Sequence, residues 1–225
     1  MTVSEPVPIA FVRTGDVVRE PVTKVGGQPV WLAEPQWPLS RSTGEPMEFL
    51  GQFALDDGRL AYLFMTDDED DFIDGTYEPE AGENALVIQP EGRIPGFVRI
   101  DGRAVGPSAG TDHLPHPSPD DAGGCAGASD EGDEGAEIAE ITEIAEIAED
   151  DVKGDDDSRP LQFLGGPGIE PHWLQGEELP GEGWRLVVQL DSCDLPFDVN
   201  FGDAGVGYAF LSPDGREGRF LWQCC

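Results

Sequence analysis

Short runs of apolar residues, each closed by a turn, set the pattern of this chain. Residues 46–55 and 60–65 alternate with a period near two on either side of an Asp-Asp-Gly turn, which predicts a hairpin. Residues 202–211 and 218–223 flank a Ser-Pro-Asp-Gly turn and predict a second hairpin that closes the chain. Further strands are expected over residues 8–13, 17–22, 84–89 and 96–100.

One order of motifs occurs twice along the chain. Gly-Gly leads to Pro-x-Trp-Leu, then to a strand-like run ending in Gln, then to Asp, and then to Tyr-x-Phe. This order predicts a duplication that relates residues 24–65 to residues 161–211. The alternative is that a β-rich chain reuses the same strand and turn residues. The residues that carry the motifs, and that we take as ligand-binding candidates, are Trp31, Gln52, Tyr62, Trp173, Gln189, Asp203 and Tyr208.

The segments around these motifs resemble a known family. GGQPVWLAEPQWP, GEPMEFLGQFAL, GRLAYLFM, FLGGPGIEPHWLQGEELP, FGDAGVGYAFL and the terminal LWQCC are similar to the YwqG-like bacterial proteins, a domain of unknown function. The resemblance covers residues 23–100 and 161–225. It implies a duplicated, β-rich fold, and it implies no established activity and no catalytic residues.

We expect a β-rich α+β fold in which two homologous halves form packed, mostly antiparallel sheets. The first half spans residues 1–105, an acidic low-complexity insert spans 106–160, and the second half spans 161–225. The insert contains EIAEITEIAEIAE, whose glutamates repeat every three residues without a lysine between them. Such like-charge pairs destabilise a helix, so we expect a frayed helix within a disordered segment. An amphipathic segment that binds a partner is the alternative.

The charge of the chain limits its partners. The formal net charge is -33, and residues 120–157 supply nearly half of it. This excess repels phosphate backbones and anionic membranes, so neither nucleic acid nor a membrane is expected as a partner, whereas a basic protein would be attracted. A generally acidic proteome would produce the same charge.

The first thirteen residues do not resemble a signal peptide, and the four cysteines do not form a secreted framework, so we expect a cytoplasmic protein.

Several catalytic and metal-binding patterns occur without the context that they require. Ser108 lies in a G-x-S-x-G pattern with Asp112 and His113 nearby, but prolines follow where a nucleophile elbow needs a helix. His113 and His116 have metal-like spacing, but they lie on no predicted helix and no Cys joins them at zinc spacing, so a polar loop is favoured. For His172 a surface or packing role is favoured, with a general-base role as the alternative. The acidic run at 67–71 does not fit a calcium loop, and the Gly-Gly pairs lack nucleotide-binding spacing, so no cofactor or metal is expected.

Two functions lead from the sequence, ahead of a third, a scaffold with a disordered acidic arm. The first is a non-enzymatic binding protein that recognises a basic protein partner, for which an immunity-like role against a basic toxin is one concrete form. The second is a small-ligand-binding or enzymatic protein with a cleft between its two halves, where the seven candidate residues would meet.

Overall fold

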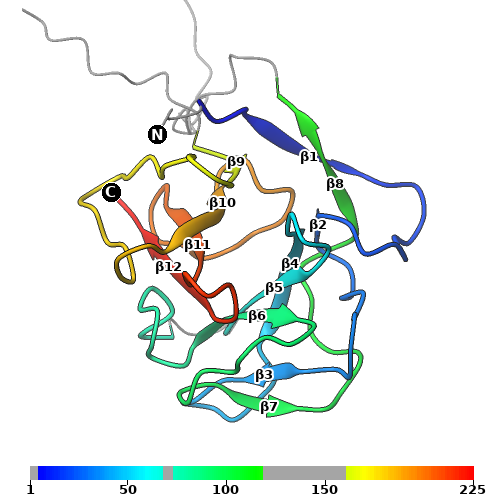
Figure 1. Cartoon of the computed structure of the whole chain (residues 1–225). Helices are drawn as coiled ribbons and strands as arrows, with labels where there is room; N and C mark the ends of the chain where they lie inside the picture. Colours follow the sequence, from blue (N-terminus) through cyan, green and yellow to red (C-terminus); the bar gives the residue numbers. More distant parts are fainter. Residues whose placement is uncertain (1–4, 68–72, 119–160) are drawn as a thin grey trace, which may run out of the picture.

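The computed structural model describes residues 5–67, 73–118 and 161–225, and in these ranges the chain is built from strands and loops (Figure 1). In chain order the strands are β1 (Ile9–Arg13), β2 (Lys24–Val25), β3 (Trp37–Leu39), β4 (Glu48–Ala54), β5 (Leu60–Met65), β6 (Asn84–Gln89), β7 (Arg99–Asp101), β8 (His113–Pro117), β9 (Phe163–Leu164), β10 (Arg185–Asp191), β11 (Val206–Leu211) and β12 (Gly218–Gln223). They form a six-stranded sheet in the order β1-β8-β2-β4-β5-β6, a four-stranded sheet in the order β12-β11-β10-β9, and the small sheet β3-β7.

The expected α+β class is wrong, because the described residues contain no helix. Every strand pairing within the three sheets is antiparallel, as expected. The physical reason lies in the connections, which are short or rich in Gly and Pro and so cannot sustain consecutive helical turns. We expect a frayed helix within a disordered insert for EIAEITEIAEIAE. This segment lies outside the described residues. No helix in the described ranges is long and apolar enough to cross a membrane.

Both predicted hairpins are confirmed. β4 pairs with β5 and β11 pairs with β12, each around the turn that the sequence indicated. The strand over 84–89 is also confirmed as β6, whereas residues 17–22 form no strand. Residues 113–117 were assigned to the insert, yet they form β8 and pair with β1 along its whole length. The first half therefore extends past the predicted boundary at residue 105.

The two halves share one arrangement of strands. In each half a three-stranded meander, β4-β5-β6 or β10-β11-β12, is preceded by a two-residue strand that pairs with its first member. Lys24 pairs with Gln52 in the first half, and Phe163 pairs with Gln189 in the second. Each meander also has a register shift at the matching place, between Phe49 and Gly51 and between Leu186 and Val188. The pairing is therefore interrupted at corresponding positions in the two halves.

Side chains alternate between a central cluster and two outer clusters. On β5, Ala61, Leu63 and Met65 join the central cluster, which also holds residues of β10, β11 and β12. Tyr62 and Phe64 point to the opposite face of the same strand, into an outer cluster that belongs to the first half. The second half has its own outer cluster around Tyr208. The two meanders are thus buried on both faces, which explains why their strands are apolar at nearly every position.

The two halves meet along both edges of their sheets. On one side an antiparallel bridge joins Pro8 to Phe163, and the amide of Ile9 donates to the carbonyl of Gln162 at 3.1 Å. On the other side β12 lies beside β6, where a Cβ added to Gly218 would be 2.3 Å from the carbonyl oxygen of Leu86. Only glycine permits this approach of the two backbones.

Cys193 is disulfide-bonded, and the thiols of Cys224 and Cys225 are free.

Candidate functional site

The structure places Trp31, Gln52 and Tyr62 together, where they hold the loop before β3. The side chain of Gln52 accepts a hydrogen bond from the amide of Val30 at 2.8 Å, and its amide group donates to the carbonyl of Val22 at 2.8 Å. The Tyr62 hydroxyl donates to the carbonyl of Val30 at 2.8 Å and accepts from the amide of Leu32 at 3.0 Å. The Trp31 ring packs on the Tyr62 ring with centroids 4.9 Å apart.

Trp173, Gln189 and Tyr208 make equivalent contacts in the second half, except that the Gln189 amide group donates to the carbonyl of His172 at 3.3 Å. Gln189 accepts from the amide of His172 at 2.9 Å. The Tyr208 hydroxyl donates to the carbonyl of His172 and accepts from the amide of Leu174, both at 3.1 Å. The Trp173 ring lies on the Tyr208 ring with centroids 4.6 Å apart. The repeated motif is therefore a loop clamp, which each half uses once.

A second glutamine in each half completes the clamp, and sequence reasoning missed it. Gln89 ends β6, accepts from the amide of Ala33 at 3.2 Å and donates to the carbonyl of Glu34 at 2.9 Å. Gln223 ends β12, accepts from the amide of Gln175 at 3.1 Å and donates to the carbonyl of Gly176 at 2.8 Å. The signal that could have revealed them is an apolar run that ends in glutamine, ALVIQ in one half and RFLWQ in the other.

The candidate residues do not meet in one cleft. Trp31 and Tyr62 belong to one outer cluster, and Trp173 and Tyr208 belong to the other. Asp203 is exposed in the loop before β11, and its carbonyl accepts from the amide of Cys225. Burial raises the pKa of Tyr62 to about 12 and raises that of Tyr208 further, so both hydroxyls stay protonated at neutral pH.

The residues of the G-x-S-x-G region serve the fold. The Ser108 hydroxyl is in hydrogen-bond contact with the side-chain amide of Gln28 at 2.9 Å. Asp112 forms an ion pair with the fully buried ammonium group of Lys24 and also accepts from the amide of Val18 at 3.0 Å. Nδ1 of His113 lies 2.7 Å from the carbonyl oxygen of Thr111. Within residues 5–67, 73–118 and 161–225, no group of three His, Cys, Asp or Glu side chains could hold a metal ion.

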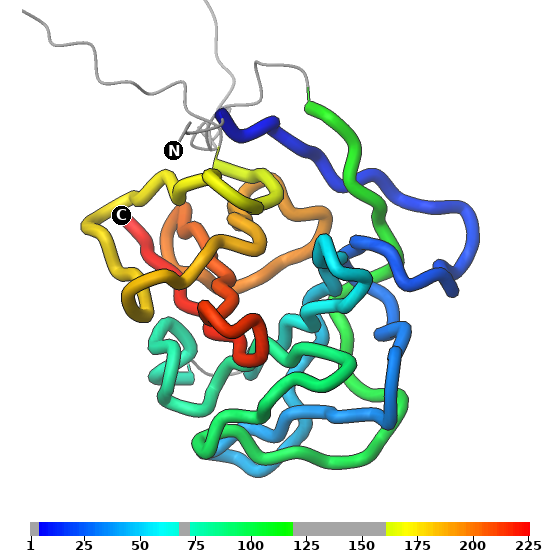
Figure 2. The backbone as a smooth tube through the Cα atoms, viewed as in Figure 1, coloured from blue at the N-terminus to red at the C-terminus, as the bar shows by residue number. Residues whose placement is uncertain are grey.

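An open groove lies where the two halves meet, and neither of its walls was predicted. Its walls are the loop after β5, which contributes residues 77–80, and the loop before β10, which contributes residues 178–180. Figure 2 shows the course of these two loops. Arg219 and Leu221 of β12 form its floor, and the groove has a volume of about 590 Å³. The lining carries three carboxylates, Glu78, Glu80 and Glu178, against the single guanidinium of Arg219.

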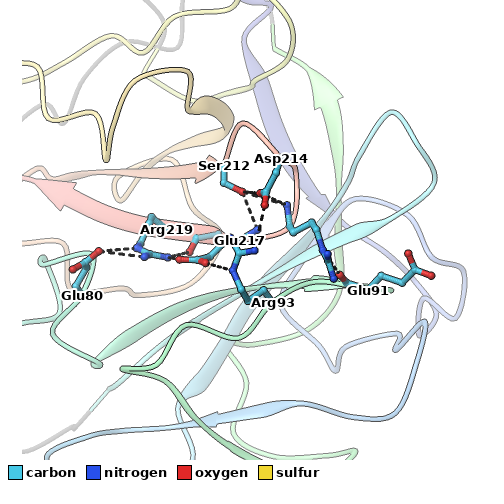
Figure 3. A network of polar contacts seen from close by, with 9 residues as sticks. Glu80, Glu91, Arg93, Ser212, Asp214, Glu217 and Arg219 are labelled. Carbon is cyan, nitrogen blue, oxygen red and sulfur yellow. Dashed lines mark hydrogen bonds and ion pairs between the residues drawn. The ribbon is translucent and has the colours of Figure 1, made fainter.

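The floor of the groove is held by an ion-pair network that joins the halves (Figure 3). Arg219 contacts Glu80 of the first half at 3.2 Å and Glu217 of the second at 2.5 Å. Arg93 of the first half contacts the other oxygen of Glu217 at 2.6 Å and Asp214 at 3.2 Å. Hydrogen bonds from the Ser212 hydroxyl and a backbone amide, together with Arg93, lower the pKa of Asp214 to about 2.

Arg219 is positioned by rings as well as by carboxylates. Its guanidinium carbon lies 4.8 Å from the centroid of Phe97 and 5.4 Å from that of Trp184. Because its two carboxylate partners already neutralise its charge, the remaining groove carboxylates, Glu78 and Glu178, give the site a negative potential.

The rim of the groove is partly apolar. Tyr77 is 40% exposed and packs edge-on against Trp222 with centroids 5.7 Å apart, and Leu179 is 39% exposed on the opposite wall. A hydrogen bond to Glu78 raises the pKa of the Tyr77 hydroxyl. An aromatic ring and an aliphatic side chain beside carboxylates are suited to a ligand with a long aliphatic stem and a positive end.

No family model matches this chain, and no curated protein is significantly similar to it. The similarity to YwqG-like proteins therefore stays a resemblance carried by the motifs quoted above.

Proposed function

We propose that this protein is a binding protein that recognises a basic partner protein through the groove between its halves. One observation carries the proposal: the carboxylates of Glu78 and Glu178 lie with the exposed Tyr77 and Leu179 around the groove of about 590 Å³. An immunity-like role, in which the partner is a basic toxin, is one concrete form.

The cytoplasm is the compartment that we propose, which the free thiols of Cys224 and Cys225 support, although Cys193 is disulfide-bonded.

The contacts favour lysine or arginine side chains of a partner. The Tyr77 ring offers its exposed surface to a cation, an interaction that contributes about 0.5–2 kcal/mol. Glu78 and Glu178 approach from opposite walls, so a basic side chain between them would be attracted from both sides. The large negative charge of the whole chain would also increase the association rate with a basic protein at low ionic strength.

A cleft that binds a small molecule through the seven motif residues is a weaker proposal. The polar groups of Gln52, Tyr62, Gln189 and Tyr208 are occupied by hydrogen bonds to the loops that they hold. A ligand would have to displace those bonds, which costs about 1–3 kcal/mol for each buried group left unpaired.

The test is a comparison of two charge-matched variants. A partner is first identified by pull-down from the native cell with mass spectrometry, and its affinity is then measured by titration. Glu78→Lys with Glu178→Lys is expected to weaken binding about tenfold or more, and the wild-type affinity is expected to fall steeply between low and physiological salt. The control, Asp16→Lys with Glu20→Lys, makes the same charge change on the exposed loop after β1.

Equal weakening by the two variants would mean that only net charge matters, and it would overturn the groove as the binding site. A salt-insensitive small molecule recovered in the pull-down, lost on Trp173→Ala or Gln189→Ala, would favour the alternative function instead.

A further inference from the structure

A second cavity lies at one end of the small sheet, away from the motifs of the sequence. It has a volume of about 410 Å³ and is lined by Arg41, Gly96, Phe97 and Arg99. Arg41 follows β3, and Arg99 begins β7 opposite Leu39 in the β3–β7 pairing. The turn in which the amide of Val98 donates to the carbonyl of Pro95 places Gly96 and Phe97 beside Arg99. The two arginines, far apart in sequence, therefore line one cavity.

Neither arginine is paired with a carboxylate in the described residues. Arg99 donates through one nitrogen to the carbonyl of Ser40 at 2.8 Å, with a longer contact of 3.5 Å to the carbonyl of Arg41, and the Arg41 guanidinium makes no hydrogen bond or ion pair within those ranges. The arginines that do have carboxylate partners there are Arg59, Arg93, Arg103 and Arg219. Arg13, Arg19, Arg185 and Arg216 also lack carboxylate partners there, but Arg41 and Arg99 are the two that line this cavity.

The backbone that carries these arginines is held in place by a buried carboxylate. Glu83 accepts hydrogen bonds from the hydroxyl of Ser40 at 2.7 Å, the amide of Ser42 at 2.7 Å and the hydroxyl of Thr66 at 2.8 Å. The Glu83 carboxylate therefore holds the segment that includes Arg41. The Ser40 carbonyl of the same segment orients Arg99. The backbone of Arg41 and the guanidinium of Arg99 are therefore held before binding, which lowers the entropy that is lost when a ligand arrives.

One wall of the cavity is aromatic. Phe97 is half-buried, and its ring is also contacted by the guanidinium of Arg219 at 4.8 Å from the centroid, so the ring has a fixed position between the cavity and the groove. A volume of about 410 Å³ is more than a bare inorganic ion fills and lies in the range of small-molecule sites.

We propose that this cavity binds a small organic anion, whose carboxylate or phosphoryl group pairs with Arg41 and Arg99 and whose apolar body packs on Phe97. The planar fork of a guanidinium matches either group through two parallel hydrogen bonds. This site differs from the groove in that it takes a ligand of opposite charge.

The test uses four probes on the full chain: phenyl phosphate, benzoate, inorganic phosphate and acetate. Binding is followed by the amide NMR signals of Gly96 and Phe97 at about 0.15 M salt, where the long-range repulsion of the acidic chain is screened beyond about 8 Å. We expect saturable shifts with at least one aromatic probe and weaker binding of its bare counterpart. The stronger of phenyl phosphate and benzoate identifies whether the natural group is phosphoryl or carboxylate.

Arg41→Gln is expected to weaken the binding of the aromatic probe about tenfold, because it removes a charged hydrogen-bond donor that has no structural role. Arg19→Gln, at an exposed arginine on another loop, is the matched control and is expected to change nothing. The NMR spectrum of each variant reports whether it is folded. Absence of saturable shifts for all four probes, or equal weakening by Arg41→Gln and Arg19→Gln, would overturn the proposal.

Discussion

Replacing Tyr208 by phenylalanine tests the loop clamp in the second half. The change removes one hydroxyl and leaves the fully buried ring in place. It also removes the two hydrogen bonds of 3.1 Å to the carbonyl of His172 and the amide of Leu174. The amide of Leu174 then lacks a partner, and the carbonyl of His172 keeps only the longer bond of 3.3 Å from the Gln189 side chain. Because these groups are only partly shielded from water, we expect a loss of about 1–3 kcal/mol in the free energy of unfolding.

The assay is urea unfolding followed by tryptophan fluorescence, since the Trp173 ring lies on the Tyr208 ring and reports directly on the clamp. Tyr62→Phe should behave in the same way, because its hydroxyl makes the equivalent pair of bonds. Tyr77→Phe is the matched control: this is the one remaining tyrosine of the chain, it is exposed, and its replacement should change stability by less than about 0.5 kcal/mol. A Tyr208→Phe effect no larger than that of the control would refute the reasoning.

The pH dependence of the same variants gives a second measurement. Burial raises the pKa of Tyr62 to about 12, above the value of about 10 for an unfolded tyrosine. The stability that this group contributes is complete below pH 10 and is lost as the pH rises toward 12, because the unfolded chain ionises first. The difference in unfolding free energy between the wild type and Tyr62→Phe should therefore shrink between pH 8 and pH 11. A constant difference in unfolding free energy would contradict a raised pKa for Tyr62.

Three further perturbations have defined outcomes. Lys24→Met should cost about 3–5 kcal/mol in urea unfolding by leaving the Asp112 carboxylate buried and unpaired, and adding Asp112→Asn should recover part of that loss. Gly218→Ala should cost about 1–3 kcal/mol by forcing β12 away from β6, whereas Gly102→Ala, which meets no atom within 4 Å, should be nearly neutral by the same assay. Deleting residues 126–157, which leaves all four cysteines in place, should keep the melting temperature within a few degrees, because a segment of such low hydrophobicity and high charge cannot repay its ordering entropy. A larger drop in calorimetry would show that the segment is docked.

The strands were predictable where local pattern and turn chemistry agree. The hairpins β4–β5 and β11–β12 and the strand β6 follow from apolar runs bounded by turns. β8 did not, because its sequence HLPHP contains two prolines and has no apolar periodicity. It is a strand because β1, about a hundred residues earlier in the chain, pairs with it residue by residue. Such long-range pairing leaves no local signal.

The sequence by itself determined the strand-forming segments, the twofold order of Trp, Gln and Tyr, and the acidic charge of the chain. The tertiary structure alone decided what those residues do, because a polar side chain is free or occupied according to which backbone groups come within hydrogen-bond distance. Gln52 and Gln189 are occupied by loops of their own halves. The groove joins Glu78 to Glu178, and the cavity joins Arg41 to Arg99, across distances in sequence that no periodic pattern spans. Local periodicity specifies the face of a strand, whereas long-range packing specifies which faces and loops meet.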